Sequence, residues 1–246
     1  MIKKIDGVVL TETPLGESSK IINLFTKEKG IIGIVCKNAK NIRNPLRTKT
    51  EKFTYGTFHI EYNENKLSKL IDVDIIDSLK NIKSDITLIS YLSYVTDLTH
   101  QVARQNDSSE IYDIYLNAIL KMNEKQDPLI LMNIVETKYL NYLGIGLNLD
   151  CCIECGSTEN IVTIDPDKGG YICKDCYTNE KILNPKSVKL LRIYNLIDIK
   201  TISKIDISPE VKNEINEFLD KYYERYAGLY LKSKKFLKNI ISISWQ

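Results

Sequence analysis

The sequence has few of the residues and none of the short motifs on which common catalytic sites depend. It contains only two histidines, His59 and His100, and it has no Gly-x-Ser-x-Gly elbow, no His-Glu-x-x-His pair and no Gly-x4-Gly-Lys-Ser/Thr loop. Acidic residues are plentiful but scattered, so spacing indicates no catalytic carboxylate pair. Both histidines are therefore interpreted as structural residues. A binding protein explains the sequence more simply than an enzyme does.

Long hydrophobic runs are also absent. No stretch approaches the roughly 18 apolar residues of a membrane-spanning helix, and the first residues, with Lys3, Lys4 and Asp6, do not resemble a secretory signal. Glycine and proline number only 11 and 6, while 43% hydrophobic and 27% charged residues exclude a disordered or fibrous chain. We expect a globular, cytoplasmic protein with no membrane partner. Its 246 residues suffice for one large domain or two of modest size.

The net charge is small, but the basic residues are unevenly placed. Lysine and arginine number 34 against 32 acidic residues, an excess too mild to imply a polyanionic partner. Residues 37–52, however, contain six basic residues and a single acidic one, Glu51. A second basic run near the C-terminus has no acidic residue after Glu224. Runs of this kind are most often solvated faces.

Four of the six cysteines form two Cys-x-x-Cys pairs. Cys152 pairs with Cys155 and Cys173 with Cys176, and 17 residues separate the two pairs. Each pair can place two thiolates on one side of a tight turn, and two such turns can complete a tetrahedron with Zn–S bonds of about 2.3 Å. The sequence therefore predicts one structural Zn²⁺.

The residues around the pairs agree with this site. Gly156 directly follows the second thiolate, where glycine takes a positive φ at little cost. Residues 165–170 form a strong turn signal, which predicts that residues 161–164 and 171–173 pair as a hairpin.

Three other interpretations of the pairs compete with structural zinc. Disulfides would need an oxidising compartment, a thioredoxin-like motif would need one pair at a strand-to-helix turn, and a catalytic zinc normally keeps an open position beside other ligands. Cys151 could replace Cys152 as first ligand, with a Cys-x3-Cys spacing, and the sequence leaves this choice open. Cys36, in an apolar run, is interpreted as a small buried hydrophobic residue.

The first 79 residues consist of short β-rich runs. Five strands are expected, at residues 7–13, 20–26, 31–37, 52–62 and 66–76. In the fourth, Phe58 and Ile60 share one face while His59 takes the other. Five short strands in so short a segment favour a small closed barrel. The OB-fold is the five-stranded barrel that commonly binds oligonucleotides.

After residue 79 the hydrophobic period becomes helical. The first helix is expected after Ser84 as N-cap, and the second over residues 109–122. The third begins with Asp127 and Pro128 and ends near Gly144. Two further helices begin at Asn184-Pro185 and Ser208-Pro209, and the last carries an apolar stripe from Val211 through Tyr226 that Leu229 extends.

The predicted fold class is α+β multidomain. An OB-fold barrel is expected at residues 1–79 and a helical domain at residues 80–246, with a four-cysteine zinc module inserted at residues 150–181. The apolar rows of the helices are interpreted as core rather than ligand sites.

Segments along the whole chain match one known family. Residues 7–10 and 15–30 resemble its opening segment, the two cysteine pairs sit where its members keep theirs, and residues 231–237 resemble its closing motif. The sequence thus resembles the bacterial recombinational repair mediator family RecO.

This resemblance implies a DNA-binding mediator that is not an enzyme. RecO proteins bind single- and double-stranded DNA, anneal complementary strands covered by single-stranded-DNA-binding protein, and act with RecR to load RecA. A nucleoid-associated location follows from that role. Because some members lack the cysteine quartet, the metal is expected to stabilise its module rather than to provide the shared activity.

Two basic runs are candidates for the binding roles that the resemblance implies, on the basis of their charge and position. We expect contacts with DNA phosphates from five residues of the first run, because they are basic and lie beside the barrel. They are Lys37, Lys40, Arg43, Arg47 and Lys49. The family also binds the acidic, apolar-ended tail of single-stranded-DNA-binding protein through its helical domain, for which Lys232, Lys234 and Lys235 are candidates. These three lysines would equally suit the negative dipole at a helix end.

Two other classes of protein remain as rivals. A zinc-ribbon RNA-binding or transcription factor would share the barrel, the zinc and the basic segment, but it would prefer RNA or a particular sequence and would not anneal strands. A metal-dependent hydrolase would need an open coordination position.

Overall fold

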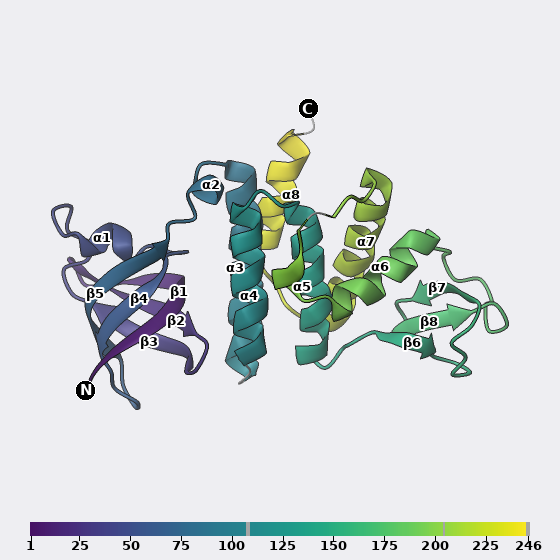
Figure 1. Ribbon diagram of the computed structural model, residues 1–246, viewed down its shortest axis with the longest axis horizontal. Helices are drawn as coiled ribbons and strands as arrows, with labels where there is room; N and C mark the ends of the chain where they lie inside the picture. Colours follow the sequence, from purple (N-terminus) through teal and green to yellow (C-terminus); the bar gives the residue numbers. More distant parts are fainter. Residues whose placement is uncertain (107–108, 204, 245–246) are drawn as a thin grey trace.

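The computed structural model describes residues 1–106, 109–203 and 205–244, and its parts follow one another along one long axis (Figure 1). A closed five-stranded barrel lies at one end, the helices occupy the middle, and a three-stranded sheet lies at the other end. The predicted α+β architecture is confirmed. Among the described residues, no helix has the length and apolar character needed to cross a bilayer.

Five strands close the N-terminal barrel. They are β1 (Ile2–Leu15), β2 (Ser19–Thr26), β3 (Gly30–Cys36), β4 (Tyr55–Glu61) and β5 (Ser68–Asp77). Their order is β1-β2-β3-β5-β4, with β3 and β5 parallel and the other pairs antiparallel. The long strand β1 pairs with both β2 and β4 and carries a bulge between Val9 and Thr11, the kind of irregularity that bends a strand around a barrel. The predicted OB barrel is confirmed.

The barrel core follows the alternation along β4. Phe58 and Ile60 are fully buried and pack with Ile22, Leu24 and other inward side chains. His59 lies on the opposite side of the strand, where its Nε2 is 2.7 Å from a carboxylate oxygen of Asp74. Alternate residues of a strand face opposite sides of its sheet, so the predicted faces of β4 are confirmed.

The start of β4 differs from the prediction. The strand begins at Tyr55 rather than at residue 52, because Phe53 has a φ of +72° and turns the chain. This turn still contacts β1, since the Phe53 N–H donates to the Val9 carbonyl at 2.8 Å and the Val9 N–H to the Thr54 carbonyl at 3.0 Å.

The alternation along β5 is broken by two bulges. Ile71 and Ile76 have no pairing residue on β4. At each of these two positions the alternation of side chains between the two faces of the sheet is interrupted. Val73 is fully buried, whereas Ile71 and Ile75 are exposed.

Besides the three strands of the small sheet, the described residues form eight helices and two irregular turns. They are α1 (Leu46–Lys49), α2 (Lys80–Lys83), α3 (Ile86–Gln105), α4 (Ser109–Asn123), α5 (Pro128–Tyr142), α6 (Pro185–Leu196), the 3-10 turn η1 (Ile199–Thr201), α7 (Pro209–Tyr222), the π-helical turn η2 (Tyr223–Ala227) and α8 (Lys232–Ser244).

Most predicted helix ends are confirmed. The Asp127 carboxylate accepts the N–H groups of Leu129 and Ile130, Pro128 occupies the first turn, and Gly144 lies just past the end with a φ of +73°. The prediction of Ser84 as the cap of α3 is wrong. Ser84 has helical angles at the end of α2, whereas Asp85 is extended and its carboxylate caps α3.

The prediction of one last helix through Leu229 is also wrong. Helix α7 ends at Tyr222, η2 continues to Ala227, and Gly228 then ends the helical path with a φ of +60°. The chain after Gly228 forms α8, which the sequence analysis missed. Helix α8 packs against α3, and Leu237 is almost fully buried there.

The barrel and the helices share a continuous apolar contact. Phe25 of β2 packs edge-on against Tyr112 of α4, with ring centroids 5.3 Å apart. Val8 and Leu10 of β1 belong to the same buried cluster as the helical core. Two ion pairs flank this contact, Lys27 with Asp113 at 2.7 Å and Lys52 with Asp97 at 3.0 Å.

Candidate metal centre and nucleic-acid surface

The cysteine module is built on a small sheet. Its strands are β6 (Asn148–Cys152), β7 (Ile161–Asp165) and β8 (Gly170–Cys173). Strands β7 and β8 form the predicted antiparallel hairpin, and β6 joins β8 in parallel as a third strand that the sequence analysis did not predict.

Each cysteine pair begins where a strand ends. Cys152 is the last residue of β6 and Cys173 the last of β8, so each following turn carries the second thiol of its pair toward the other turn. Gly156 has the expected positive φ of +75°, and its N–H donates to the Cys152 carbonyl at 2.8 Å. A hydrogen bond holds the second turn to the residue before β7, because the Lys174 N–H donates to the Asn160 carbonyl at 2.9 Å.

The four sulfurs converge on one point. The Sγ atoms of Cys152, Cys155, Cys173 and Cys176 all lie within 4.8 Å of one another, and those of Cys155 and Cys173 are 3.6 Å apart. A tetrahedron with Zn–S bonds of about 2.3 Å requires sulfurs about 3.8 Å apart, so one ion fits between them. Two of the thiols are buried, one is half-buried and one is exposed.

The structure also separates Cys152 from Cys151. Neighbouring side chains on a strand point to opposite faces, so only one of the two can join the cluster. The Cys151 sulfur faces the Asn148 side-chain oxygen at 3.9 Å, while the Cys152 sulfur belongs to the quartet. Cys36 is fully buried within the barrel, and burial raises the pKa of its thiol to about 12, as expected for an unreactive core residue.

Electrostatics around the quartet favour a bound cation. Burial opposes ionisation of Cys152, but the N–H groups of Cys155, Cys173 and Glu154 outweigh it and lower the pKa of Cys152 to about 6. The neighbouring thiols of Cys155 and Cys173 raise the pKa of Cys176 to about 12. Without a metal, the hydrogen bonds that the Cys176 thiol makes with these neighbours favour its protonated form, and a bound cation would favour the thiolate instead.

The module is anchored to the helices through its hairpin turn. Arg225 forms an ion pair with Asp167, and the Tyr226 hydroxyl donates to the Asp167 carbonyl at 3.5 Å. At the base of the sheet, the Tyr171 hydroxyl donates to the Val188 carbonyl of α6 at 3.2 Å.

The basic segment lies between β3 and β4 on the barrel surface. Lys37, Arg43 and Arg47 are exposed, the Lys40 ammonium donates to the Gly16 carbonyl at 3.0 Å, and Lys49 pairs with Asp72 at 3.0 Å. Two of the five assigned residues, Lys40 and Arg47, line one cleft of about 430 Å³. Lys49 lies instead on a second cleft of the barrel, beside α2.

Lys20 is a residue of this surface that the sequence analysis missed. It lies on β2, is only 6% exposed, pairs with Glu12 at 2.6 Å and donates to the Arg47 carbonyl at 3.4 Å. Lys20 therefore holds the basic segment against the barrel. No signal in the sequence marks it, because it appears there as one lysine at the start of an ordinary strand.

A groove between α3, α5, α7 and α8 contains part of the C-terminal basic run. This groove of about 570 Å³ is lined by the apolar side chains of Tyr91, Met132 and Leu237 and by Lys212, Lys234 and Lys238. Lys234 is largely buried and forms ion pairs with Glu136 at 2.8 Å and Asp220 at 2.7 Å. Lys232 and Lys235 are exposed.

These lysines do not lie at a negative helix end. Lys232 is the first residue of α8, so Lys232, Lys234 and Lys235 occupy its N-terminal turns, where the helix dipole is positive. The dipole explanation considered from the sequence therefore does not hold, and their role in binding a partner tail stays a prediction.

The two histidines lie far apart in the fold. His59 on β4 contacts Asp74, and His100 on α3 is half-buried. Burial, followed by the charge of Arg104, lowers the pKa of His100 and so favours its neutral form.

Two family models match this chain. The model described as "Recombination protein O N terminal" matches residues 1–79, and "Recombination protein O C terminal" matches residues 83–235.

Proteins named "DNA repair protein RecO" are similar to the chain along nearly its whole length. The relative from Bacillus pumilus (strain SAFR-032) is 34% identical over 247 residues, which cover 99% of this chain and 96% of the relative. The relative from Listeria monocytogenes serotype 4b (strain CLIP80459) is 32% identical over 243 residues, with coverage of 97% and 95%. That from Bacillus subtilis (strain 168) is 30% identical over 247 residues, with coverage of 99% and 96%.

The chain combines an OB barrel, a helical part and a four-cysteine cluster, and the two family models together match residues 1–79 and 83–235. These findings place it in a class of DNA recombination and repair proteins. Within that class the chain belongs to the RecO family, and the resemblance drawn from its sequence is confirmed.

Proposed function

We propose that this chain is a recombinational repair mediator that acts at DNA without catalysing a covalent step. It binds single- and double-stranded DNA, anneals complementary strands coated with single-stranded-DNA-binding protein and, with RecR, assists the loading of RecA at the nucleoid. The main support is the match to both RecO family models together with a basic cleft on an OB barrel. Residues 1–79 serve as the DNA-binding domain, and residues 80–246, with the module at 150–181, as the helical domain.

DNA contacts the basic segment through its phosphates. Lys37, Arg43 and Arg47 are exposed, and Lys40 and Arg47 share a cleft, so a backbone can run along this side of the barrel. Each phosphate contact releases counterions, and affinity therefore falls steeply as salt rises. DNA binding that is equally tight at about 50 and about 200 mM salt contradicts the assignment.

One Zn²⁺ holds the cysteine module together. Cys152, Cys155, Cys173 and Cys176 would bind it and close its coordination shell, and a closed four-thiolate shell supplies structural stability rather than Lewis-acid chemistry. The backbone donors around Cys152 keep that sulfur ionised and oriented for the metal.

The groove beside α8 receives the tail of single-stranded-DNA-binding protein. An aromatic end needs an apolar pocket and a terminal carboxylate needs a cation, and the groove offers Met132 and Leu237 beside Lys212 and Lys238. These two lysines already pair with Asp127 at 2.7 Å and Asp220 at 2.9 Å, so a tail carboxylate must compete with those partners. Lys234 is already neutralised by two carboxylates, so its part is to position α8. Lys232 and Lys235 do not line this groove, so replacing both by alanine and titrating a tail peptide tests whether they contribute from outside it. Unchanged affinity removes them as candidates.

The annealing of precoated strands tests the function as a whole. Complementary DNA strands are covered with single-stranded-DNA-binding protein, and duplex formation is followed with and without the chain. We expect clear acceleration by the full chain. A preference for RNA with no acceleration would instead support a zinc-ribbon RNA-binding factor, and substrate turnover would contradict a purely mediating role.

A further inference from the structure

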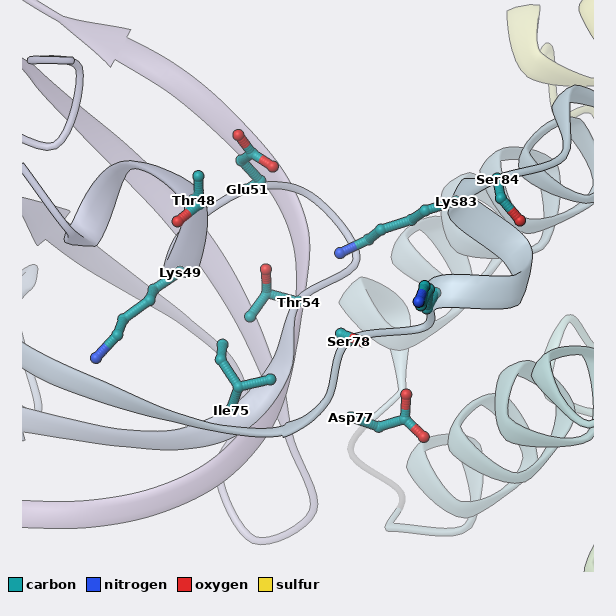
Figure 2. Close-up of a pocket in the computed structure, with 10 residues that line it drawn as sticks. Thr48, Lys49, Glu51, Thr54, Ile75, Asp77, Ser78, Lys83 and Ser84 are labelled. Carbon is teal, nitrogen blue, oxygen red and sulfur yellow. The ribbon is translucent and has the colours of Figure 1, made fainter.

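A cleft of about 450 Å³ lies where the barrel meets the helices (Figure 2). Its walls come from α1 and the loop after it, from the end of β5, and from α2. Three lysines and four hydroxyl groups line it, namely Lys49, Lys80, Lys83, Thr48, Thr54, Ser78 and Ser84. A set of ammonium and hydroxyl donors with few acceptors suits a phosphate group.

Two of these lysines have no carboxylate partner. Lys49 and Lys52 pair with Asp72 and Asp97 at 3.0 Å each, whereas Lys80 and Lys83 take part in no ion pair within the described residues. Figure 2 shows Lys83 reaching from α2 across the cleft toward the loop that carries Thr54.

The surroundings of the Lys83 ammonium make an anion favourable there. Although the side chain is solvent-exposed as a whole, protein atoms crowd its end, and this burial lowers the pKa of Lys83. The charges of Glu51 and Asp77 oppose this shift, but neither carboxylate forms an ion pair with Lys83, so the cost of its lost hydration is only partly offset. An anion that enters the cleft removes part of that cost and holds Lys83 in its charged form.

The acidic residues of the cleft do not cancel this preference. The Asp77 carboxylate accepts the Leu79 N–H at 2.7 Å and the Asn123 amide at 3.3 Å, and Figure 2 shows it turned away from Lys83. Asp77 therefore fixes the junction between β5 and α2. Glu51 remains as a carboxylate on the wall and should weaken the binding of any anion.

The cleft continues the basic surface of the barrel. Glu51 lines both this cleft and the one that holds Lys40 and Arg47, so the two clefts are neighbours. A strand whose phosphates pass Lys40 and Arg47 can therefore continue into the cleft that Lys80 and Lys83 line.

We propose that the junction cleft binds a backbone phosphate of DNA through Lys80 and Lys83, and so extends the DNA path from the barrel onto α2. The inference rests on the proposed function, because it presumes that the barrel binds DNA. It adds two residues to the DNA surface and places one bound strand across both parts of the molecule.

The test compares two double variants of the full chain. In K80A/K83A the cleft loses both lysines, while K186A/K189A removes two exposed lysines with the same spacing from α6, far from the barrel. Anisotropy of a fluorescein-labelled oligothymidylate gives affinity and salt slope between about 50 and 200 mM salt. Circular dichroism checks that the thermal midpoints match that of the unchanged chain.

The expected result is specific to the cleft. K80A/K83A should bind about tenfold more weakly, and its salt slope should fall by about 1.4, at about 0.7 for each lost contact with a single strand. K186A/K189A should bind as the unchanged chain does. Glu51→Gln should bind more tightly, because it removes a negative charge from the cleft.

Other outcomes overturn the inference in distinguishable ways. If the unchanged chain binds DNA but K80A/K83A keeps both its affinity and its salt slope, the inference fails and the proposed function stands. Equal losses in both double variants also reject it, because net charge would then explain the effect. Inorganic pyrophosphate is a further probe. If the unchanged chain and K186A/K189A bind it saturably and K80A/K83A does not, while K80A/K83A still binds DNA normally, the cleft is a site for a free phosphate and the inference fails. If the unchanged chain does not bind DNA, the proposed function itself fails.

Discussion

At the scale of single residues, the direction of one side chain decides which of two adjacent cysteines joins the metal centre. Cys151 and Cys152 are neighbours on β6, and only Cys152 places its sulfur in the quartet. The proposed zinc site therefore includes one of two chemically identical groups, and a pair of matched substitutions separates them.

We expect Cys152→Ser to abolish stable zinc binding, while Cys151→Ser retains one zinc per chain. A serine hydroxyl is a poor substitute for a thiolate ligand, whereas Cys151 contacts only Asn148. Zinc content of the purified variants, measured by plasma emission spectrometry, checks this. Equal zinc content in the two variants would show that Cys151 can serve as a ligand.

The buried ion pair of Lys234 is a second feature at this scale. Glu136 is fully buried, and its carboxylate accepts both the Lys234 ammonium at 2.8 Å and the Tyr94 hydroxyl at 2.5 Å. Within the part of the chain that the structure describes, Lys234 is its one ion-pair partner. Burial opposes the charged form of Lys234, but Glu136 and Asp220 outweigh it and raise its pKa.

Lys234→Ala should lower the free energy of unfolding by about 3 kcal/mol, because it leaves the Glu136 charge buried and uncompensated. The double variant E136Q/K234M should lose clearly less, since neither charge then remains. Urea denaturation of the two variants measures the difference. The ion pair raises the folded-state pKa, so its contribution is complete below about pH 10.4 and declines as pH rises through the folded value. Equal losses in both variants would mean that packing, not charge, explains the effect.

At the scale of secondary-structure elements, one glycine separates the last two helices. Gly228 ends η2 with a φ of +60° and allows α8 to run back along α3. A Cβ at this position would meet no atom within 4 Å, so the backbone angle is the only obstacle to a larger residue.

Gly228→Ala should reduce the free energy of unfolding by about 1 kcal/mol, the cost of a left-handed angle for a residue with a Cβ. Gly228→Asn should cost less, because asparagine tolerates this region better. Chemical denaturation of both variants provides the measurement. Identical stability of all three proteins would show that the chain can reach α8 through a different turn.

At the scale of the whole molecule, the barrel and the cysteine module lie at opposite ends of the helices (Figure 1). The barrel joins the helical core through Phe25 and its apolar neighbours, whereas the module is held by Asp167, Tyr171 and the residues that they contact. Loss of the metal therefore acts at the end that is remote from the basic segment.

Removal of zinc by a chelator should loosen residues 150–181 first and leave the barrel folded. Amide hydrogen exchange should rise in β6, β7 and β8 while β1 to β5 keep their protection. Affinity for single-stranded DNA should change less than about twofold, because no phosphate contact is lost. Early loss of protection in the barrel would show that the metal stabilises the entire molecule.

Local patterns determined much of this protein. The two Cys-x-x-Cys pairs, Gly156, the hairpin turn at residues 165–170 and the alternation of Phe58 and Ile60 each depend on neighbours within a few positions. Such signals are confirmed in the structure because the geometry they require is short-range. The Asp127-Pro128 helix start belongs to the same group.

The tertiary structure decided what depends on distant partners. The bulges that expose Ile71 are set by pairing with β4, and the left-handed Phe53 is fitted to hydrogen bonds with β1. Helix α8 is polar through much of its length, and its position depends on packing against α3 and on the charges of Glu136 and Asp220.

The sequence by itself thus specified the barrel, the family and a cluster of four cysteines, up to the choice between Cys151 and Cys152. Only the folded chain decided that choice, brought Lys80 and Lys83 beside α1, and fixed Lys234 in a buried ion pair. The physical reason is that periodicity and motif spacing report contacts between near neighbours. The surroundings of a single charged or thiol group are set by segments that meet only after folding.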